Sequence, residues 1–181
     1  MERRRLLLAA AGSAVAAACG SPLASASPSP SRSALATATA TASKATIELA
    51  KGGSFTFALR PDKAAQTVAR FVGKARSGFY QGLSFHRVED WVVQGGDPTG
   101  SGFGGTQVPS EYNDLPFVAG AVGIARANNP ALMNDSQFFI VKIDSHHLDG
   151  TFANFGLLNP SDMPLVQGIK IGDKIKSIKI E

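Results

Sequence analysis

Short apolar segments with a two-residue period recur along the chain from residue 45 onward, and glycines lie at many of their ends. Apolar and polar residues alternate over 45–50 and again over 54–59, and the intervening Lys51–Gly53 is typical of a turn, which together predict a β-hairpin. Further short strands are expected over 83–88, 91–94, 121–127, 137–143, 152–158 and 173–181. Segments of this length cannot form a core singly, so they must share one within a sheet.

Only one helix is clearly predicted. It opens at Pro61 and ends at Gly78, and a further helical turn is expected near 163–168. The apolar face of the long helix is formed by Val68, Phe71, Val72 and Ala75. Many short strands with Gly- and Pro-rich connections predict an all-β domain, either a sandwich or a closed barrel. The glycines at strand ends favour the closed barrel, because glycine suits tight corners.

The length and the cysteine content restrict how such a domain is stabilised. The chain has 181 residues, enough for one domain, with 44% hydrophobic and 18% charged residues, as in ordinary globular proteins. Its single cysteine is Cys19, so no disulfide can form within the chain. Burial of apolar side chains must therefore hold the core together.

Residues 1–19 have the organisation of an export signal. Three arginines precede the 13-residue apolar run Leu6–Ala18, which is too short for a membrane-spanning helix but suits the apolar region of a signal. Cys19 follows directly, and Ala16–Cys19 resembles a bacterial lipobox, so we expect cleavage before Cys19 and a diacylglycerol on its thiol. The alternative is a plain secretory signal cut near Ala18. The arginines also resemble a twin-arginine signal.

Residues 20–43 have a different composition. Ala, Ser, Thr and Pro account for 20 of these 24 residues. Such a segment has too little apolar bulk to offset its ordering entropy, so we expect a disordered tether between a membrane and the folded domain, residues 44–181. The expected location is extracytoplasmic, anchored to the cell membrane by the N-terminal lipid. Under the alternative signal the protein would be secreted or periplasmic.

The positive charge of the chain belongs mainly to the leader. The whole chain carries a formal net charge of +4, of which residues 1–43 supply +3 and residues 44–181 only +1. Because the domain has no basic tract, we expect no nucleic-acid partner. The sequence carries no signal for oligomers, and we expect a monomer.

Several kinds of catalytic site are excluded by pattern. Six of the eleven residues in 95–105 are glycine, but the segment lacks the G-K-[ST] of a phosphate-binding loop and no helix pattern follows. There is no G-x-S-x-G motif of a serine hydrolase. Two of the three histidines, His146 and His147, are adjacent and do not suit convergence on one metal ion, so we expect no metal and no cofactor. Glu89-Asp90 is interpreted as a polar turn rather than a catalytic pair.

Arg87 is the candidate functional residue in this region. It lies in the expected strand 83–88, which is followed by the apolar strand WVVQ and then by the glycine-rich segment. One interpretation is a surface arginine whose stem packs on a neighbour. The other is a guanidinium at the rim of an apolar pocket, where its rigid fork of donors addresses a bound amide. The residues by themselves leave both open.

The motifs FHRV, WVVQGGDPTGSGFGG, IARA, SQFFI and LDGTFANFG, in this order, resemble those of the cyclophilin-type peptidyl-prolyl cis/trans isomerases. The resemblance extends from about Ala45 to Glu181. It implies an eight-stranded antiparallel barrel closed by two helices, no cofactor, and binding of proline-containing peptides and unfolded protein clients. It also implies isomerase activity, and together with the export signal this predicts a role in the folding of extracytoplasmic proteins.

The resemblance assigns the catalytic role to Arg87, which follows the histidine of FHR. It assigns substrate binding to ten further positions, namely Trp91, Val92, Gln94, Ala125, Arg126, Gln137, Phe139, His147, Leu148 and Phe152. Ala125 and Arg126 match the segment whose backbone pairs with a bound peptide.

Four of these positions depart from the residues usual in the family. Trp91 and Val92 stand where Phe and Met are usual, His147 stands where Trp is common, and Phe152 stands where His is common. These departures leave a second hypothesis open. The domain would then bind proline-containing peptides as a chaperone module with little or no catalysis.

Overall fold

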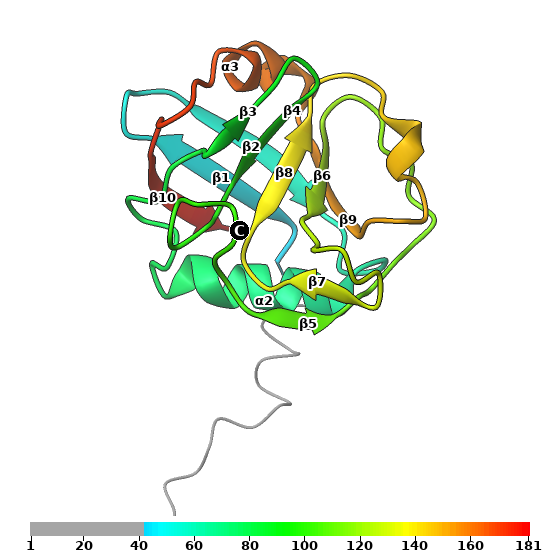
Figure 1. The fold of residues 1–181 in the computed structure, drawn as a ribbon. Helices are drawn as coiled ribbons and strands as arrows, with labels where there is room; N and C mark the ends of the chain where they lie inside the picture. Colours follow the sequence, from blue (N-terminus) through cyan, green and yellow to red (C-terminus); the bar gives the residue numbers. More distant parts are fainter. Residues whose placement is uncertain (1–41) are drawn as a thin grey trace, which may run out of the picture.

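One antiparallel sheet of eight strands forms most of the domain in the computed structural model, which describes residues 42–181 (Figure 1). Its strands are β1 (Lys44–Leu49), β2 (Ser54–Leu59), β3 (Arg87–Val88), β4 (Val92–Gly95), β6 (Ala121–Ile124), β8 (Phe138–Val141), β9 (Asn154–Leu158) and β10 (Ile175–Ile180). Their order across the sheet is β10, β1, β2, β9, β6, β8, β4 and β3. The hairpin predicted from the alternating segments is the β1–β2 pair, in which Ile47 lies opposite Phe55.

The sheet curls, and this brings the segments that precede its two edge strands, β3 and β10, side by side. A single bridge joins Ser84 to Lys174, and the Phe85 N–H donates to the Asp173 carbonyl at 2.9 Å. β3 is only two residues long, because the chain turns at residue 89, and it forms no continuous ladder with β10. The all-β class is confirmed as a curled eight-stranded sheet, whereas a fully closed barrel is not confirmed.

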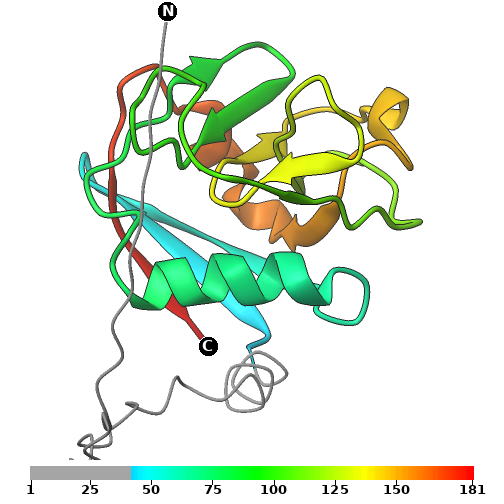
Figure 2. The same ribbon diagram turned by 60° about the horizontal axis from the view of Figure 1, so that its bottom comes forward.

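Two α-helices lie at opposite ends of the curled sheet, α2 (Ala65–Arg76) below it and α3 (Met163–Gln167) above it in the view of Figure 1. Figure 2 shows α2 along the open end, where it packs against β10. The predicted apolar face of α2 is confirmed, since Val68, Phe71 and their partners on this face are buried. α2 starts four residues after Pro61, because residues 61–63 form a turn first.

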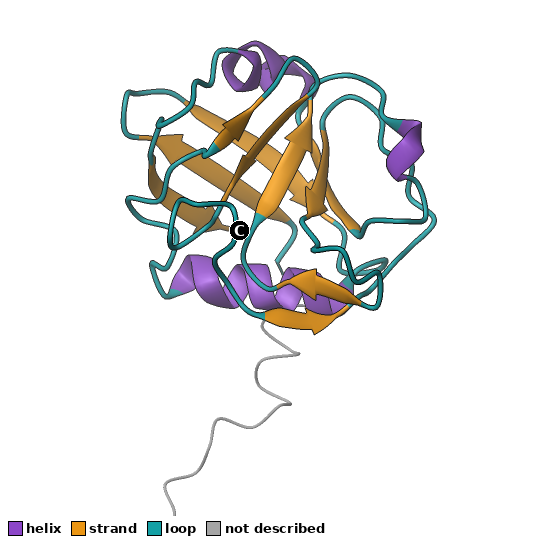
Figure 3. Cartoon of the chain, viewed as in Figure 1, coloured by secondary structure: helices purple, strands orange, loops and turns teal. Residues whose placement is uncertain are grey.

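A second, two-stranded antiparallel sheet was not predicted. It pairs β5 (Gln107–Pro109) with β7 (Leu132–Asn134), and Figure 3 shows it beside α2. Each strand has three residues, too few for a periodic pattern to be recognised. Two 3₁₀ turns, His146–Leu148 and Pro160–Asp162, complete the regular structure.

An aromatic cluster fills the space between the sheet and α2. Phe71 of α2 is at its centre, with ring centroids 5.7 Å from Phe57, 5.3 Å from Tyr80, 5.8 Å from Phe138 and 5.3 Å from Phe155. All five side chains are buried, and large aromatic rings in tilted or edge-on contact contribute both apolar area and favourable ring geometry. The core is therefore held by burial, as a chain without a disulfide requires.

The ends of the described chain meet. Ser43 and Lys44 both donate their N–H groups to the Glu181 carbonyl, at 2.6 and 3.0 Å. Ala42 is only 2% exposed, so Ala42 and Ser43, the last residues of the segment expected to form the tether, pack on the domain. The expected signal (residues 1–19), its Cys19 and the rest of the tether lie outside the described residues. Within residues 42–181, no helix has the length and apolar character needed to cross a membrane.

Truncating the central ring should be costly. We expect Phe71→Ala to lower the free energy of unfolding by about 3–5 kcal/mol, because it leaves a cavity among four other rings. Thermal unfolding followed by circular dichroism would measure this. Ile171→Ala is the control, since Ile171 is 70% exposed and its truncation should change stability by less than about 0.5 kcal/mol. Equal effects of the two substitutions would contradict this account of the core.

Candidate active site

Strands β4 and β8 are buried on both faces, and this gives the domain a second apolar cluster. Side chains alternate across a strand, so Phe138 and Ile140 of β8 enter the main core while Phe139 and Val141 point the other way. On β4, Val93 joins the main core and Val92 the second cluster. The continuous apolar runs in FFIV and WVV are thereby explained.

The second cluster is the floor and wall of a pocket of about 130 Å³. The pocket is lined by Arg87, Trp91, Val92, Gln94, Ala125, Arg126, Phe139, Leu148 and Phe152. All nine were assigned to the site by the family resemblance. They come from β3, β4, β8 and the segments after β6 and around the 3₁₀ turn, so residues up to 65 positions apart in the sequence meet here.

Phe139 is fixed between two other aromatic rings. The Phe117 ring stacks on it with centroids 5.6 Å apart and an interplanar angle of 19°, and the Phe152 ring meets it edge-on at 5.6 Å and 89°. Gly123 lies opposite Phe139 in the β6–β8 ladder, and any β-carbon there would collide with the rings of Phe139 and Phe117. The floor of the pocket is therefore rigid and apolar.

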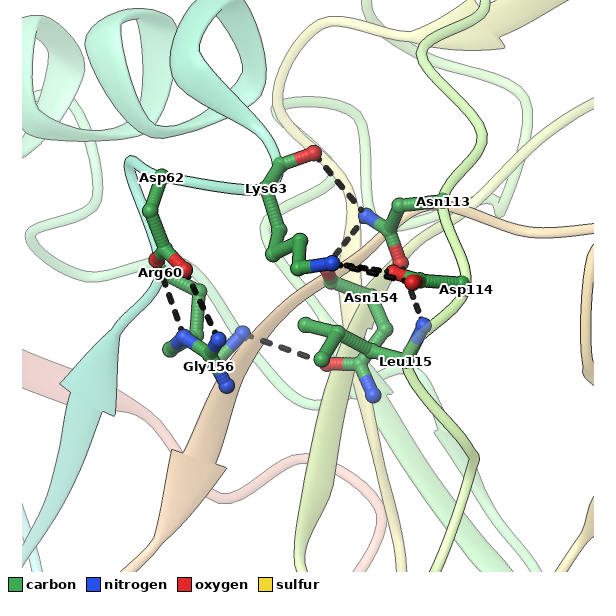
Figure 4. Close-up of polar contacts among 8 residues, drawn as sticks. All are labelled: Arg60, Asp62, Lys63, Asn113, Asp114, Leu115, Asn154 and Gly156. Carbon is green, nitrogen blue, oxygen red and sulfur yellow. Dashed lines mark hydrogen bonds and ion pairs between the residues drawn. The ribbon is translucent and has the colours of Figure 1, made fainter.

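The long connection that carries Phe117 is held by polar contacts, and Figure 4 shows those made by Lys63, Asn113 and Asp114. Lys63 donates to both carboxylate oxygens of Asp114, at 2.7 and 2.9 Å, and Asn113 donates its amide to the Asn154 carbonyl at 2.8 Å. The Phe117 N–H itself donates to the Asp149 carboxylate at 2.7 Å. These contacts position a residue that no periodic pattern in the sequence indicated.

A chain of polar side chains runs along one side of the pocket. The Arg87 Nη1 donates to the Gln94 Oε1 at 3.4 Å, and the Gln94 Nε2 donates to the Gln137 Oε1 at 2.9 Å. Gln137 in turn donates to the carbonyls of Gly102 and Gly104 in the glycine-rich loop, at 3.1 and 2.8 Å. The pattern of donors and acceptors orients both glutamines, and through them the loop is joined to Arg87.

The glycine-rich loop is organised by a buried carboxylate. Asp97 accepts from the Thr99 N–H and hydroxyl, at 2.8 and 2.9 Å, and from the Gly102 N–H at 2.5 Å. Burial opposes the charge of Asp97, but these hydrogen bonds outweigh it and keep the pKa of the carboxyl below its ordinary value. The loop thus turns around a fixed charge and places the Gly102 and Gly104 carbonyls at Gln137.

Arg87 and Trp91 share one carboxylate. The Arg87 Nε and the Trp91 Nε1 each donate to a different oxygen of Glu89, both at 2.7 Å. These hydrogen bonds, that of Arg87 first and that of Trp91 second, hold the pKa of Glu89 below its ordinary value. The guanidinium also lies over the Trp91 ring, 5.3 Å from its centroid. The expected polar turn is present, and in it the Glu89 carboxylate binds two residues of the pocket lining.

Arg126 forms the opposite rim of the pocket. Its Nε donates to the Thr151 carbonyl at 3.0 Å, and its guanidinium lies 4.7 Å from the centroid of the Phe152 ring. The backbone N–H of the preceding Ala125 donates to the Gln137 carbonyl and the Ala125 carbonyl accepts from the Asn134 N–H. Among residues 42–181, neither backbone group of Arg126 pairs with another backbone group.

Two residues assigned by the resemblance lie outside this lining. Gln137 borders an adjacent, larger pocket of about 410 Å³, which is also lined by Phe103 and shares Gln94, Ala125 and Arg126 with the first. His147 packs edge-on against the outer side of the Trp91 ring, with centroids 5.4 Å apart. Sequence reasoning missed two residues that support the site, Phe117 and Glu89. The available signal for Glu89 was its acidic side chain two positions after Arg87.

Comparisons with known proteins identify the family of this site. The family model for "cyclophilin type peptidyl-prolyl cis-trans isomerase/CLD" matches residues 44–181. The chain belongs to the cyclophilin-type peptidyl-prolyl cis-trans isomerases. The peptidyl-prolyl cis-trans isomerase of Synechococcus elongatus is 38% identical over 142 residues, covering 76% of this chain and 96% of that protein. Peptidyl-prolyl cis-trans isomerase B of Bacillus subtilis is 38% identical over 138 residues, covering 74% and 94%.

Solved cyclophilin structures have the same fold. The crystal structure of a Cryptosporidium parvum cyclophilin-type isomerase superposes with a TM-score of 0.68 at 24% identity, covering 77% of this chain and 98% of that one. The structure of the same protein in the presence of the dipeptide Ala-Pro gives a TM-score of 0.67 at 26% identity, covering 76% and 98%. The cyclophilin fold is therefore established for this chain.

The floor of the cyclophilin pocket can be tested at Gly123. We expect Gly123→Ala to push the Phe139 ring toward the pocket, to cost about 1–3 kcal/mol of stability through overpacking, and to raise KM for proline peptides. Gly73→Ala is the matched control, because Gly73 lies in α2 with open space around its α-carbon. It should raise stability by about 1 kcal/mol and leave KM unchanged. A Gly123→Ala protein with normal stability and KM would refute this description of the floor.

Proposed function

We propose that this protein is a peptidyl-prolyl cis/trans isomerase that accelerates rotation of X–Pro bonds in extracytoplasmic proteins, with Arg87 as its catalytic residue. The observation that carries the residue assignment is the position of the Arg87 guanidinium, at the rim of an apolar pocket whose floor is the clamped Phe139 ring. The pocket would hold the proline ring among Phe139, Leu148 and Val92. The peptide backbone would pair with Arg126, since the backbone groups of Ala125 are already paired within the domain.

The chemistry follows from the electronic structure of the amide. The X–Pro bond resists rotation because the nitrogen lone pair is delocalised into the carbonyl, with a barrier of roughly 18–20 kcal/mol. When the bond is twisted, this delocalisation is lost and the nitrogen becomes a hydrogen-bond acceptor. A donor on the Arg87 guanidinium aimed at that nitrogen would bind the twisted state better than either planar state, which lowers the barrier.

Arg87 and Gln94 retain hydrogen-bond donors that the proposed mechanism can use. Arg87 Nε is occupied by Glu89 and Nη1 contacts Gln94, so the fork is oriented with donor capacity left for substrate. Gln94 Nε2 uses one N–H on Gln137, which leaves its other N–H to donate to the substrate carbonyl. No group has to be deprotonated, because arginine donates in its ordinary charged form.

Removing the guanidinium tests this mechanism. We expect Arg87→Ala to lower kcat/KM by about tenfold or more, or at least ~1.4 kcal/mol of transition-state stabilisation, with little change in Tm. A protease-coupled assay and NMR exchange of an Ala-Pro peptide would both measure the rate. Wild-type activity should be nearly flat between about pH 6 and 9, since arginine stays charged, and since the pKa of Glu89 is lowered its carboxylate is lost only at more acidic pH.

Arg76→Ala is the control for Arg87→Ala, because Arg76 is an exposed arginine in the last turn of α2. It should keep the wild-type rate. An unchanged rate in Arg87→Ala would remove Arg87 from the mechanism. A wild-type protein that binds proline peptides without accelerating their exchange would instead support the chaperone-module hypothesis.

The leader supports a proposal about location. The apolar run Leu6–Ala18 followed by Cys19 supports export and acylation, and residues 20–41 supply enough chain for the domain to reach client proteins near a membrane surface. On this proposal the protein is held outside the cytoplasm by a diacylglycerol on Cys19 and acts on unfolded clients as a monomer.

Acylation can be tested directly. We expect Cys19→Ala to release the protein from the membrane fraction or to leave its leader uncut, because a lipobox peptidase requires the cysteine. Metabolic labelling with a fatty-acid analogue and fractionation of cells would measure both. Ser21→Ala, two residues further on, is the control and should remain membrane-bound. Normal processing and membrane attachment of Cys19→Ala would overturn the lipid anchor and favour a secreted or periplasmic protein.

A further inference from the structure

Glu89 occupies the turn between the strand that carries Arg87 and the strand that follows Trp91. Its N–H donates to the Val92 carbonyl at 2.8 Å, which closes the turn. Its carboxylate then faces back along the pocket rim and accepts from the Arg87 Nε and the Trp91 Nε1, both at 2.7 Å. One side chain that does not itself line the pocket is thus bound to two that do.

From this geometry we infer that Glu89 is a positioning residue, which holds the Arg87 guanidinium and the Trp91 indole in the orientation that the isomerisation requires. The inference rests on the proposed catalytic role of Arg87. The reacting group would remain the guanidinium, and Glu89 would act through it.

The need for such a residue follows from the exposure of Arg87. Its side chain is 42% exposed, and a long, flexible side chain at a rim would otherwise sample many rotamers. Glu89 fixes Nε, Gln94 receives Nη1, and the Trp91 ring lies 5.3 Å below the guanidinium, so the plane and the direction of the fork are both set. A donor misplaced by about 1 Å can lose a large part of a rate enhancement.

Trp91 is positioned by the same carboxylate. Its ring packs against the second apolar cluster on one side and contacts His147 and the guanidinium, but it lies outside the strand ladder. The hydrogen bond from Nε1 fixes the flip state of the indole, and with it the wall that the pocket presents to a proline ring. A phenylalanine at this position would have no donor for Glu89.

A stabilising role alone predicts a different outcome. The ion pair of Glu89 with Arg87 is exposed on both sides, 44% and 42%, and exposed pairs contribute little to the free energy of unfolding. Loss of Glu89 should therefore leave Tm nearly unchanged and lower the rate. A residue that merely holds the turn would show the reverse.

The experiment uses the full chain with Glu89→Gln and Glu89→Ala. Asp90→Asn is the matched control, because Asp90 is the adjacent exposed acid in the same turn and lies outside the pocket lining. We expect kcat/KM for an Ala-Pro peptide to fall about tenfold in Glu89→Ala and by a smaller factor in Glu89→Gln, mainly through kcat, while Asp90→Asn keeps the wild-type rate. Tm should be unchanged in all three.

Trp91 gives a second readout that does not depend on activity. It is the only tryptophan in the chain, so the intrinsic indole fluorescence reports the surroundings of Trp91 alone, including its hydrogen bond to Glu89. Both Glu89 variants should shift the emission maximum and increase acrylamide quenching, and Asp90→Asn should do neither. Unchanged emission in Glu89→Ala would overturn the positioning of Trp91.

A double-mutant cycle separates this inference from the mechanism on which it rests. If Glu89 acts mainly through Arg87, Glu89→Ala should cost much less in a protein that already carries Arg87→Ala, because only the positioning of Trp91 is then left to lose. Additive losses, or a wild-type rate in Glu89→Ala when Arg87→Ala is slow, would overturn the role of Glu89 and leave the catalytic arginine in place. A wild-type rate in Arg87→Ala would refute the catalytic role itself.

Discussion

Burial of β4 and β8 on both faces is the constraint on which the rest of the structure depends. Each strand sends alternate side chains into the main core and into the pocket, so Phe138 and Phe139, adjacent in sequence, serve opposite sides of the sheet. The pocket floor cannot move without disturbing the packing behind it, where Phe138 meets Phe71. The pocket floor is therefore as rigid as the core behind it.

The polar side of the site is built differently, from a relay of hydrogen bonds. Glu89, Arg87, Gln94 and Gln137 follow one another from an exposed turn to the glycine-rich loop. Each has a partner that fixes its orientation, and the loop at the end is itself wound around the buried Asp97 carboxylate. On the proposed mechanism, the apolar floor would select a ring-shaped group, while the relay would aim donors at the bond beside it.

Local periodicity was sufficient for much of the fold. The apolar face of α2 and the β1–β2 hairpin follow from spacing within a dozen residues, and both are present as predicted. The β5–β7 pair was missed, because three-residue strands carry no period and their pairing depends on a long-range contact. Full closure of the sheet is not confirmed, and the shortness of β3 is decided by the turn at Glu89 and not by strand propensity.

The site could be assigned from family motifs, but its supports could not. Phe117 lies in an irregular connection and reaches Phe139 only because Asn113, Asp114 and Asp149 fix that connection from three directions. Glu89 looked like any acid in a turn, because whether its carboxylate faces solvent or its neighbours depends on the backbone path of two strands.

The meeting of the two chain ends has a mechanical consequence. Residue 43 leads directly into β1, which lies between β10 and β2 in the sheet and is hydrogen-bonded to both. A pull transmitted through the N-terminal segment would load these two ladders in shear, so that many backbone hydrogen bonds share the force at once instead of opening one after another. The strand that directly follows the N-terminal segment is thus the one best placed to resist being drawn out of the domain.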